Sequence, residues 1–261
     1  MCGAAGFALP GPARVLPLLG FLLIGLSCDE DPVSVEDRVW AVEQQDRSLL
    51  ALPFASPDCV SRGYVADELG PVAFDEEENL LGVDLLLLRL LEVEVSNAYT
   101  TPRFDLPGLE EPRALTIAPG NRHYLLDAGT RLLQLDAESG SWTRSWSLLP
   151  ESGWTALAWL PVAMESPNGQ ALSVGTLLVW RPAGSGGELA WLELEEGQAL
   201  AHSLMATPRL SALETSRRKD ELYALDATGG EFYRLRPWRG EITPLQSYPC
   251  QPFRIGDIAI P

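Results

Sequence analysis

A short apolar pattern that recurs about every 45 residues constrains the fold of this chain more than any other feature. In each copy two apolar residues flank two others, and an acidic residue usually follows. The fifth positions of the copies are residues 43, 92, 136, 181 and 226, so the copies lie 49, 44, 45 and 45 residues apart. Repetition at this interval indicates an array of similar small sheets. The five copies are Val39–Glu43, Leu88–Glu92, Leu132–Asp136, Leu177–Arg181 and Leu222–Asp226.

Each copy is predicted to be a strand that ends at a tight turn. Ala-Glu-Ser-Gly follows Asp136, and Ala-Thr-Gly-Gly follows Asp226. An aspartate at the start of a turn can accept backbone N–H bonds, and a glycine supplies the positive φ that closes the turn. We therefore assign Asp136, Gly140, Asp226 and Gly229 to turn formation, and no residue is assigned a catalytic role.

A second recurrent segment, apolar with small residues interleaved, precedes several copies. It occurs at 114–119, 155–161 and 255–261, and the last example ends the chain. Short side chains suit an innermost strand, where sheets crowd around an axis. The first copy of the pattern has no such segment in front of it. We therefore expect residues 255–261 to pair with the strand near Trp40 and to close a ring, which removes an open sheet edge.

These features predict an all-β fold, a small β-propeller of five blades over residues 33–261. An irregular β-sandwich with fortuitous spacing is the alternative fold. The leucine-rich segment 80–91 suits a helix almost as well as two buried strands. The expected blades are 252–261 with 33–58, then 63–110, 113–150, 154–198 and 199–248.

The segment from Leu135 to Gly140, with Trp146 downstream, resembles the blade repeat of quinoprotein-type propellers, and the segment from Leu222 to Gly229 is similar. That family includes quinone-cofactor dehydrogenases and non-enzymatic envelope lipoproteins that act as assembly scaffolds. The dehydrogenases are much longer and commonly carry adjacent cysteines, which this sequence lacks. The resemblance therefore implies the fold, favours the scaffold branch and gives no reason to expect a cofactor.

The amino terminus is predicted to be an export signal. Arg14 is the only charged residue before Asp29, an apolar run covers residues 15–26, and the run stops at Ser27 and Cys28. The run is shorter than the roughly 20 residues of a membrane-spanning helix, and positive charge before an apolar core is typical of a secretory signal. The predicted signal peptide covers residues 1–27.

Ser27 and Cys28 resemble the processing site of bacterial lipoproteins, in which a small residue precedes a cysteine that receives a diacylglycerol. Gly25 and Leu26 depart from the usual residues, and together with Ser27 they also resemble an ordinary cleavage site that would leave no lipid. The resemblance implies lipidation of Cys28, a tether at 28–32, and a membrane anchor in the bacterial cell envelope that faces the periplasm or the cell surface.

The cysteine count favours the lipid. Cys28, Cys59 and Cys250 remain after cleavage, an odd number in an oxidising compartment. If Cys28 carries lipid, the other two can pair. We therefore predict a disulfide between Cys59 and Cys250 that clasps the ring at its seam, with Cys59 placed after the outer strand of the first blade. Two separate buried thiols are the alternative.

The charge of the chain limits its partners. The formal net charge is −17, and the longest basic run is 217–219, so we expect no nucleic-acid partner. An acidic surface is also repelled by anionic membranes, which leaves the lipid as the means of attachment. We expect a monomer whose partners are envelope proteins.

No catalytic or metal-binding motif is visible. His123 and His202 lack the spacing of a zinc site; we expect His123 at a strand edge and His202 on an inner strand, each packed or solvated. The acidic run 75–79 lacks the ligand pattern of a calcium loop and is expected to be a solvated loop. Four tryptophans are expected to pack between blades, with an aromatic glycan platform as the alternative: Trp142, Trp146, Trp180 and Trp238.

We therefore expect a non-enzymatic binding or scaffold protein without metal or cofactor. The alternative is a lactonase-like or lyase-like propeller enzyme with a carboxylate-bound metal in the central channel, and Asp257 is the acid best placed for it. A metal requires several converging oxygens. Three or more Asp, Glu, Asn or His side chains at one level of the channel would favour the enzyme, whereas a channel lined by alanine, isoleucine and tryptophan would exclude it.

Overall fold

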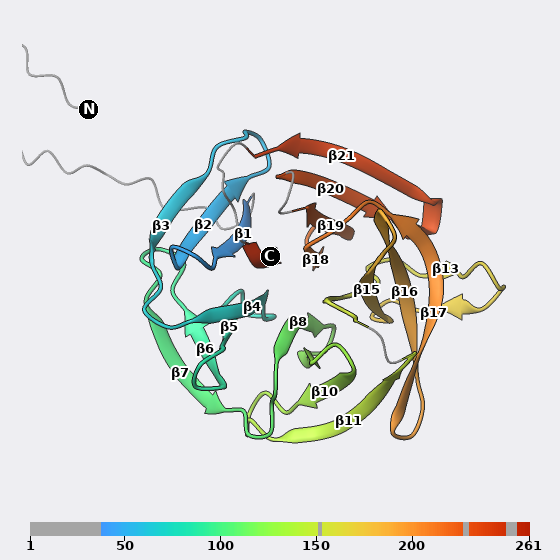
Figure 1. Cartoon of the computed structure of the whole chain (residues 1–261), viewed down its shortest axis with the longest axis horizontal. Coiled ribbons are helices and arrows are strands. Elements are labelled where there is room, and N and C mark those ends of the chain that lie inside the picture. The colour runs from blue at the N-terminus through green and yellow to red at the C-terminus, as the bar shows by residue number, and fades with distance from the viewer. Residues whose placement is uncertain (1–37, 151–152, 227–229, 249–254) are drawn as a thin grey trace, which may run out of the picture. The chain divides into compact units, whose positions relative to one another are not determined.

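The computed structural model describes residues 38–150, 153–226, 230–248 and 255–261, all within one compact unit, Ser34–Pro261. These residues form strands and turns, together with one short 3-10 turn at Pro237–Arg239. The sheets surround a common axis in a propeller-like arrangement (Figure 1), rather than packing face to face as in a sandwich. The prediction of an all-β, propeller-like fold is confirmed.

Three of the sheets in the described residues have four strands each, ordered outward from the axis (Figure 1). The first sheet consists of β22 (Ile255–Ala259), β1 (Arg38–Glu43), β2 (Ser48–Pro53) and β3 (Val60–Tyr64). The second consists of β4 (Leu69–Phe74), β5 (Leu80–Asp84), β6 (Arg89–Val93) and β7 (Thr100–Asp105). The third consists of β18 (Ala212–Ser216), β19 (Glu221–Asp226), β20 (Glu231–Arg236) and β21 (Glu241–Ser247).

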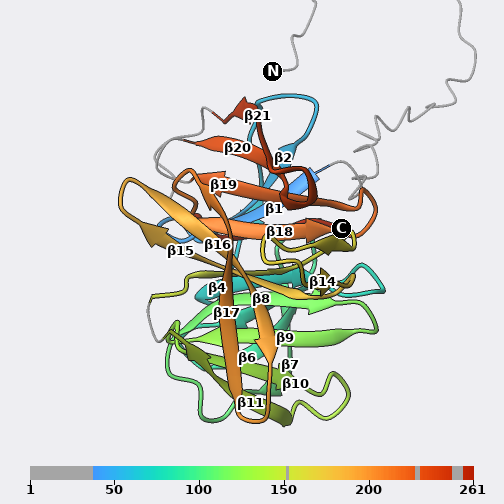
Figure 2. The same cartoon turned by 90° about the vertical axis from the view of Figure 1, so that its right-hand side faces the viewer.

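An eight-stranded sheet completes the ring. Its order is β12 (Ala156–Trp159), β15 (Leu177–Ala183), β16 (Gly186–Leu194), β17 (Gln198–Thr207), β11 (Trp142–Leu149), β10 (Arg131–Leu135), β9 (Arg122–Asp127) and β8 (Pro112–Ala118). It comprises two runs of four strands that meet at the rim, where β11 and β17 pair in parallel with Leu148 opposite Ala199. Figure 2 shows this rim from the side. A small hairpin, β13 (Met164–Glu165) and β14 (Ala171–Leu172), is inserted between β12 and β15.

The last strand of the chain pairs with the first. β22 runs antiparallel to β1, with Trp40 opposite Ala259 and Ala41 opposite Ile258, as the sequence predicts for residues 255–261. The innermost strands also form a closed circuit, because β22 contacts β4, β4 contacts β8, β8 contacts β12, β12 contacts β18, and β18 contacts β22. The closure pairs an edge that would otherwise be open.

The hydrophobic core lies between neighbouring sheets. One cluster joins Val39 and Leu52 of the first sheet to Tyr223 and Phe232 of the third, and similar clusters fill the other junctions. Burial of these apolar side chains is the main favourable contribution to folding. The four tryptophans named from the sequence all contribute to such clusters: Trp142, Trp146, Trp180 and Trp238.

The repeat pattern does not mark the same strand in every sheet. The copies ending at 43, 181 and 226 lie on β1, β15 and β19, each next to an innermost strand, whereas those ending at 92 and 136 lie on β6 and β10, one strand further out. Both positions are buried strands that end at turns, so both satisfy the same pattern. The inserted β13–β14 hairpin lengthens its own repeat, and the even spacing is therefore partly coincidental.

Two details of the predicted boundaries are wrong, whereas the two buried strands considered for segment 80–91 are confirmed. β3 lies beyond the predicted limit of the first blade at residue 58, so Cys59 precedes the outer strand of that sheet instead of following it. β17 belongs with β16 and not with the segment 199–248, because it pairs with β16 over nearly its whole length. The segment 80–91 forms β5 and β6 and no helix, since a turn at 85–88 separates two buried strands.

Candidate functional site

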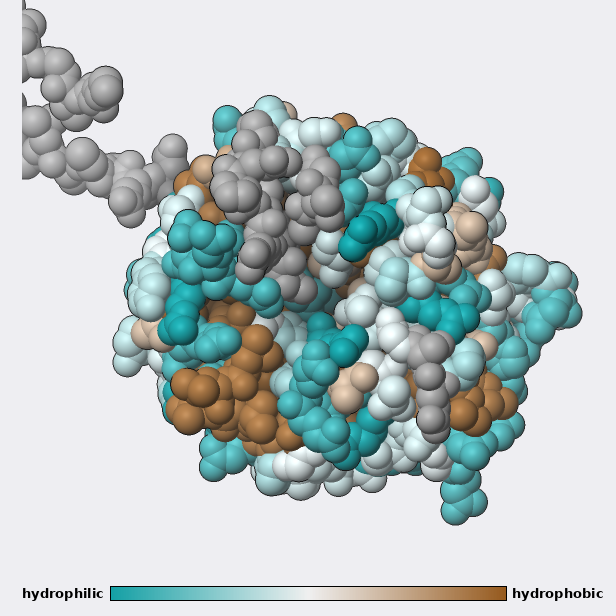
Figure 3. Space-filling model, in the orientation of Figure 1, coloured by the Kyte–Doolittle hydropathy of each residue, from teal (hydrophilic) through white to brown (hydrophobic). Residues whose placement is uncertain are grey.

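One face of the ring carries a depression of about 470 Å³ around the axis. We call it the linker face, because the linkers that lead into β8, β12 and β18 line the depression together with two turns. Figures 1 and 3 view this face. The lining residues are Gln44 and Leu85 from the turns, and Glu110, Glu111, Pro112, Arg113, Thr155 and Ser211 from the linkers.

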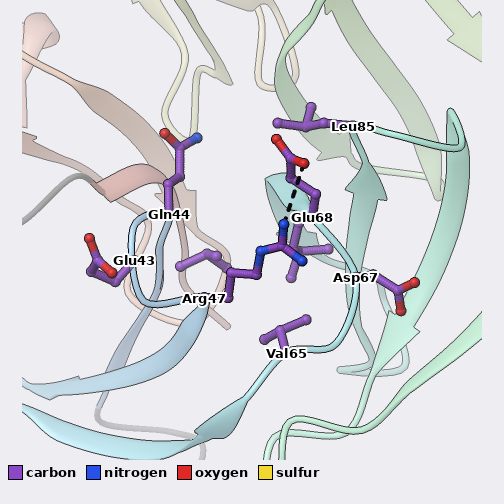
Figure 4. Close-up of a pocket in the computed structure, with 9 residues that line it drawn as sticks. Glu43, Gln44, Arg47, Val65, Asp67, Glu68 and Leu85 are labelled. Atoms are coloured by element: carbon purple, nitrogen blue, oxygen red, sulfur yellow. Dashed lines mark ion pairs between the residues drawn. The ribbon is translucent and has the colours of Figure 1, made fainter.

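A smaller pocket of about 90 Å³ adjoins the depression and shares Gln44 and Leu85 with it (Figure 4). An ion pair between Arg47 and Glu68, 3.7 Å long and solvent-exposed, spans the pocket. Four apolar side chains and three further polar ones complete its lining: Val42, Val65, Leu69 and Leu85, with Glu43, Gln44 and Asp67.

The turn between β5 and β6 presents two leucines to solvent beside these pockets. Leu86 is 73% exposed and Leu87 is 57% exposed. The buried Asp84 carboxylate accepts the N–H groups of Leu86 at 2.9 Å and Leu87 at 3.1 Å, and it pairs with Arg89 at 3.0 Å. Figure 3 shows hydrophobic surface gathered in this region of the linker face.

The left-handed residue of this turn is Leu88, which is partly buried and packs against the core cluster that includes Leu90 and Leu106. Leu88 has a φ of +49°, a left-handed conformation that costs a side chain with a Cβ roughly 1–2 kcal/mol. Glycine, asparagine or aspartate would form the turn at lower cost. Leu86 and Leu87, by contrast, are exposed side by side in the sequence, and contiguous exposed apolar surface is typical of a binding surface.

Carboxylates outnumber guanidinium groups around the two pockets. Their lining includes Glu43, Asp67, Glu68, Glu110 and Glu111, against Arg47 and Arg113. The linker that carries Glu110 and Glu111 is held in place by a neighbouring turn. The fully buried Asp127 carboxylate accepts the N–H groups of Glu110 at 3.1 Å and Glu111 at 2.8 Å, and it also pairs with Arg131. The acidic lining is therefore fixed by the fold.

Two buried acids face the axis from the innermost strands. Asp257 on β22 is 3% exposed and accepts the N–H of Ile258 at 3.0 Å and that of Val72 at 3.3 Å. Glu214 on β18 is 4% exposed, and its Oε1 accepts the N–H of Thr215 at 2.7 Å and the hydroxyl of Thr116 at 3.3 Å. Glu214 Oε2 has no hydrogen-bond partner among the described atoms.

Burial raises the pKa of both carboxyl groups well above their ordinary values, and the charge of Asp257 raises the pKa of Glu214 further. Sequence analysis identified Asp257 but missed Glu214, which is a single acid in an otherwise ordinary strand. Within the described residues no group of three His, Cys, Asp or Glu side chains could hold a metal ion. The channel acids thus form a pair rather than a set of three ligands.

On the opposite face, the acidic run at 75–79 and the basic run at 217–219 meet. Arg217 pairs with Glu76 at 3.2 Å, and Arg218 pairs with Glu78. Glu76 also accepts the N–H groups of Gly120 at 2.7 Å and Asn121 at 3.0 Å, and the Asn121 N–H contributes most to lowering the pKa of Glu76. Glu76, Glu77 and Glu78 are exposed, as expected, but Asp75 is buried, and the run also joins three of the sheets.

The two histidines lie on different kinds of strand. His123 on β9 is buried, its Nε2 lies 3.0 Å from Asn121 Oδ1, and burial lowers its pKa to about 4. His202 lies on β17, at the outer end of its four-strand run, so its predicted place on an inner strand is wrong. The ring of His202 stacks on Trp191 with centroids 4.3 Å apart. Small residues are interleaved along β17 as they are along the innermost strands, which explains the wrong prediction.

The turn residues from the sequence lie as follows. The Asp136 carboxylate accepts the N–H groups of Glu138 at 3.1 Å and Ser139 at 2.7 Å. Gly140 has a φ of +70°, and its N–H donates to the Asp136 carbonyl at 2.9 Å. Asp226 ends β19, and its carbonyl accepts the N–H of Gly230 at 2.8 Å. Gly229 lies outside the described residues.

The predictions that concern lipidation and the disulfide remain predictions. Cys28 and Cys250 lie outside the described residues, while Cys59 is half-buried and packs against the cluster that includes Phe54. No helix in the described part of the chain has both the length and the apolar character needed to span a membrane.

No known protein family and no curated protein matches the sequence. Among solved structures, a gluconolactonase from Xanthomonas campestris is 12% identical over 83% of this chain and 79% of its own, with a TM-score of 0.51. A chain of a nidogen–laminin complex is 13% identical over 81% of this chain and 78% of its own, also with a TM-score of 0.51. A virginiamycin B lyase from Staphylococcus aureus is 13% identical over 84% of this chain and 69% of its own, with a TM-score of 0.45. The first two of these neighbours are β-propellers, and their likeness to this chain shows the fold alone.

Proposed function

We propose that this chain is a non-enzymatic binding or scaffold protein of the bacterial cell envelope, anchored by a lipid on Cys28, which uses its linker face to hold a protein partner. The observation that carries the proposal is the leucine turn. Two exposed leucines, Leu86 and Leu87, stand beside two connected pockets, as is typical of a binding surface.

The proposed scaffold is a five-bladed propeller that acts as a monomer. The parallel contact of β11 with β17 supports this count, because it divides the eight-stranded sheet into two four-strand blades. A disulfide between Cys59 and Cys250 would clasp the blade formed by β22 and β1–β3.

The course of β1 is compatible with a tether at its amino end. β1 begins at Arg38, beside the carboxyl end of β22, and it reaches the small pocket of the linker face at Glu43. A tether that enters at Arg38 therefore leaves the linker face clear for a partner facing the periplasm or the cell surface.

The second candidate is a lactonase-like or lyase-like hydrolase. The paired acids Glu214 and Asp257 favour it, because strongly raised pKa values often occur at catalytic sites. Their exposures of 4% and 3% count against it, since a substrate resting in the depression would not touch either group without a movement of the innermost strands.

The anchor is tested by intact-mass analysis of the membrane fraction of a bacterium that expresses the full chain. The proposal predicts diacylglycerol mass on a chain that begins at Cys28, and loss of membrane association in the Cys28→Ser variant. A soluble chain with an unmodified cysteine would remove the anchor.

The linker face is tested by photo-crosslinking in the same cells. A photoreactive amino acid in place of Gln44, which lines both pockets, is expected to give a discrete protein adduct. The same amino acid in place of Leu245, which is 40% exposed on β21, serves as the control. Equal adducts at the two positions, or none at Gln44, would contradict the proposal.

The enzyme alternative has its own test. Hydrolysis of a lactone panel by the purified chain, lost in both Glu214→Gln and Asp257→Asn variants that keep the fold, would contradict a non-enzymatic role. The proposal predicts that hydrolysis stays at the background rate in the parent chain and in both variants.

A further inference from the structure

We infer that the linker face binds a polypeptide segment that carries basic side chains next to an apolar one. The inference rests on the proposed function and names the chemistry of the partner. It depends on three properties of the face: the size of the small pocket, the exposed leucines and the excess of carboxylates.

The small pocket fits one side chain. Its volume of about 90 Å³ is well below the roughly 300–1,000 Å³ of a typical small-molecule site. Its apolar lining comes from Val42, Val65 and Leu69. An aliphatic side chain seated there would also contact Leu85, at the start of the turn that exposes Leu86 and Leu87. The pocket and the turn thus form one apolar contact surface.

The charge around the pockets determines which residues can flank the apolar side chain of the bound polypeptide. Five carboxylates and two guanidinium groups line the two pockets, and Arg89 pairs with Asp67 from outside the lining at 2.7 Å. The remaining excess of carboxylates attracts a cationic segment and repels an anionic one. The ion pair between Arg47 and Glu68 is long and about half exposed, so it contributes little to stability. A lysine or arginine of the partner can therefore replace Arg47 beside Glu68 at little cost.

The same charges disfavour the other occupants of an exposed leucine surface. An anionic lipid surface would meet the acidic lining of the two pockets and be repelled. A second copy of this chain, bound through the same face about a twofold axis, would place the acidic lining against an identical acidic lining. A basic polypeptide remains as the occupant with complementary charge.

The test measures peptide binding to the exported full chain carrying Cys28→Ser, which needs no detergent. Three labelled nonapeptides are compared by fluorescence anisotropy: one leucine flanked by lysines, the same peptide with serine for leucine, and one leucine flanked by glutamates. We expect the first to bind at least about tenfold more tightly than the third, which corresponds to about 1.4 kcal/mol, and more tightly than the second.

Variants of the face identify the binding surface. Leu86→Ser with Leu87→Ser is expected to weaken binding of the lysine–leucine peptide about fivefold and to abolish its preference over the serine peptide. Glu68→Gln with Glu110→Gln is expected to weaken binding and to reduce its salt dependence. The matched controls are Leu245→Ser for the leucines and Glu138→Gln with Glu196→Gln for the acids, both expected to change binding less than about twofold.

Equal binding of the lysine and glutamate peptides, or equal losses in the face variants and their controls, would overturn the inference. If the peptides fail to bind while the crosslinker at Gln44 still gives a discrete adduct, the partner chemistry is wrong and the proposed function stands. If both fail, the linker face is not a binding surface.

Discussion

At the scale of single residues, the buried titratable groups act on stability in opposite directions. Glu214 and Asp257 are acids whose burial favours the protonated form. His123 is a base whose burial favours the neutral form. All three charged forms are penalised because they lose water in the interior. The domain is therefore sensitive to pH from both sides.

His123 limits stability on the acid side. Its pKa is lowered to about 4 in the folded chain, below about 6.5 in the unfolded chain. The stability that the chain has with His123 neutral is therefore fully present above about pH 6.5, and it is lost as the pH falls towards 4. We expect His123→Gln, which stays neutral, to gain about 2 kcal/mol relative to the parent chain on going from pH 7 to pH 5. Urea unfolding at the two pH values measures this, and a constant difference between the chains would contradict it.

Glu214 limits stability on the basic side. Its pKa is raised in the folded chain, so the folded state binds the proton more tightly than the unfolded state. The contribution is complete below the unfolded pKa of about 4.3 and is lost as the pH rises towards the folded pKa. We expect Glu214→Gln to be more favourable at pH 8 than at pH 5, relative to the parent chain. Thermal unfolding at both pH values checks the sign, and the opposite trend would show that Glu214 is ionised in the folded chain without penalty.

At the scale of elements, the aspartates at the ends of strands have two different structural roles. Asp136 caps an exposed turn through the N–H groups of Glu138 and Ser139. Asp127 lies fully buried and joins its turn to the linker at Glu110 and Glu111. Sequence analysis assigned Asp136 to a turn but did not distinguish these situations, because burial depends on the neighbouring sheet.

Substitution of these two aspartates separates the roles. We expect Asp127→Ala to reduce the free energy of unfolding by about 2–4 kcal/mol, because it removes the buried acceptor shared by the N–H groups of Glu110 and Glu111 and by Arg131. Asp136→Ala is expected to cost about 1 kcal/mol, since water can replace its carboxylate. Chemical denaturation of both variants measures the difference, and equal losses would show that the linker is not held through Asp127.

The strands also show how much of the fold could be predicted from the sequence. The closing strand was predictable, because 255–261 has the small, apolar composition of an innermost strand and the first copy of the pattern lacks such a segment. The position of each strand within its sheet was not predictable, because any buried strand before a turn satisfies the apolar pattern. β17 imitates an innermost strand, since its sequence also interleaves small residues with apolar ones.

The candidate site was much less predictable than the fold. In the sequence the leucines at 85–88 belong to a continuous apolar segment, 80–91. Composition alone does not show that they form a turn, which the Asp84 carboxylate caps. Glu214 meets Asp257 and Thr116 only through strands that are distant in the sequence. Contacts of this kind depend on the register of separate sheets, which a single sequence does not contain.

At the scale of the whole domain, the ring is held by contacts between distant parts of the chain. β22 pairs with β1, β11 pairs with β17, and the ion pairs of Arg217 and Arg218 with Glu76 and Glu78 cross between sheets on the face opposite the linker face. The linker face carries the two connected pockets. Its acidic lining and its exposed leucines can meet a partner only if the ring keeps its linkers together.

Closure of this ring is the claim on which the account depends, and nuclear magnetic resonance of the isotope-labelled domain tests it most directly. The account predicts cross-strand nuclear Overhauser effects between Ala41 and Ile258 and between Trp40 and Ala259, with slow amide exchange along β22. Fast exchange at Ile258 and Ala259 without contacts to β1 would contradict closure, and with it the arrangement of linkers that forms the proposed binding face.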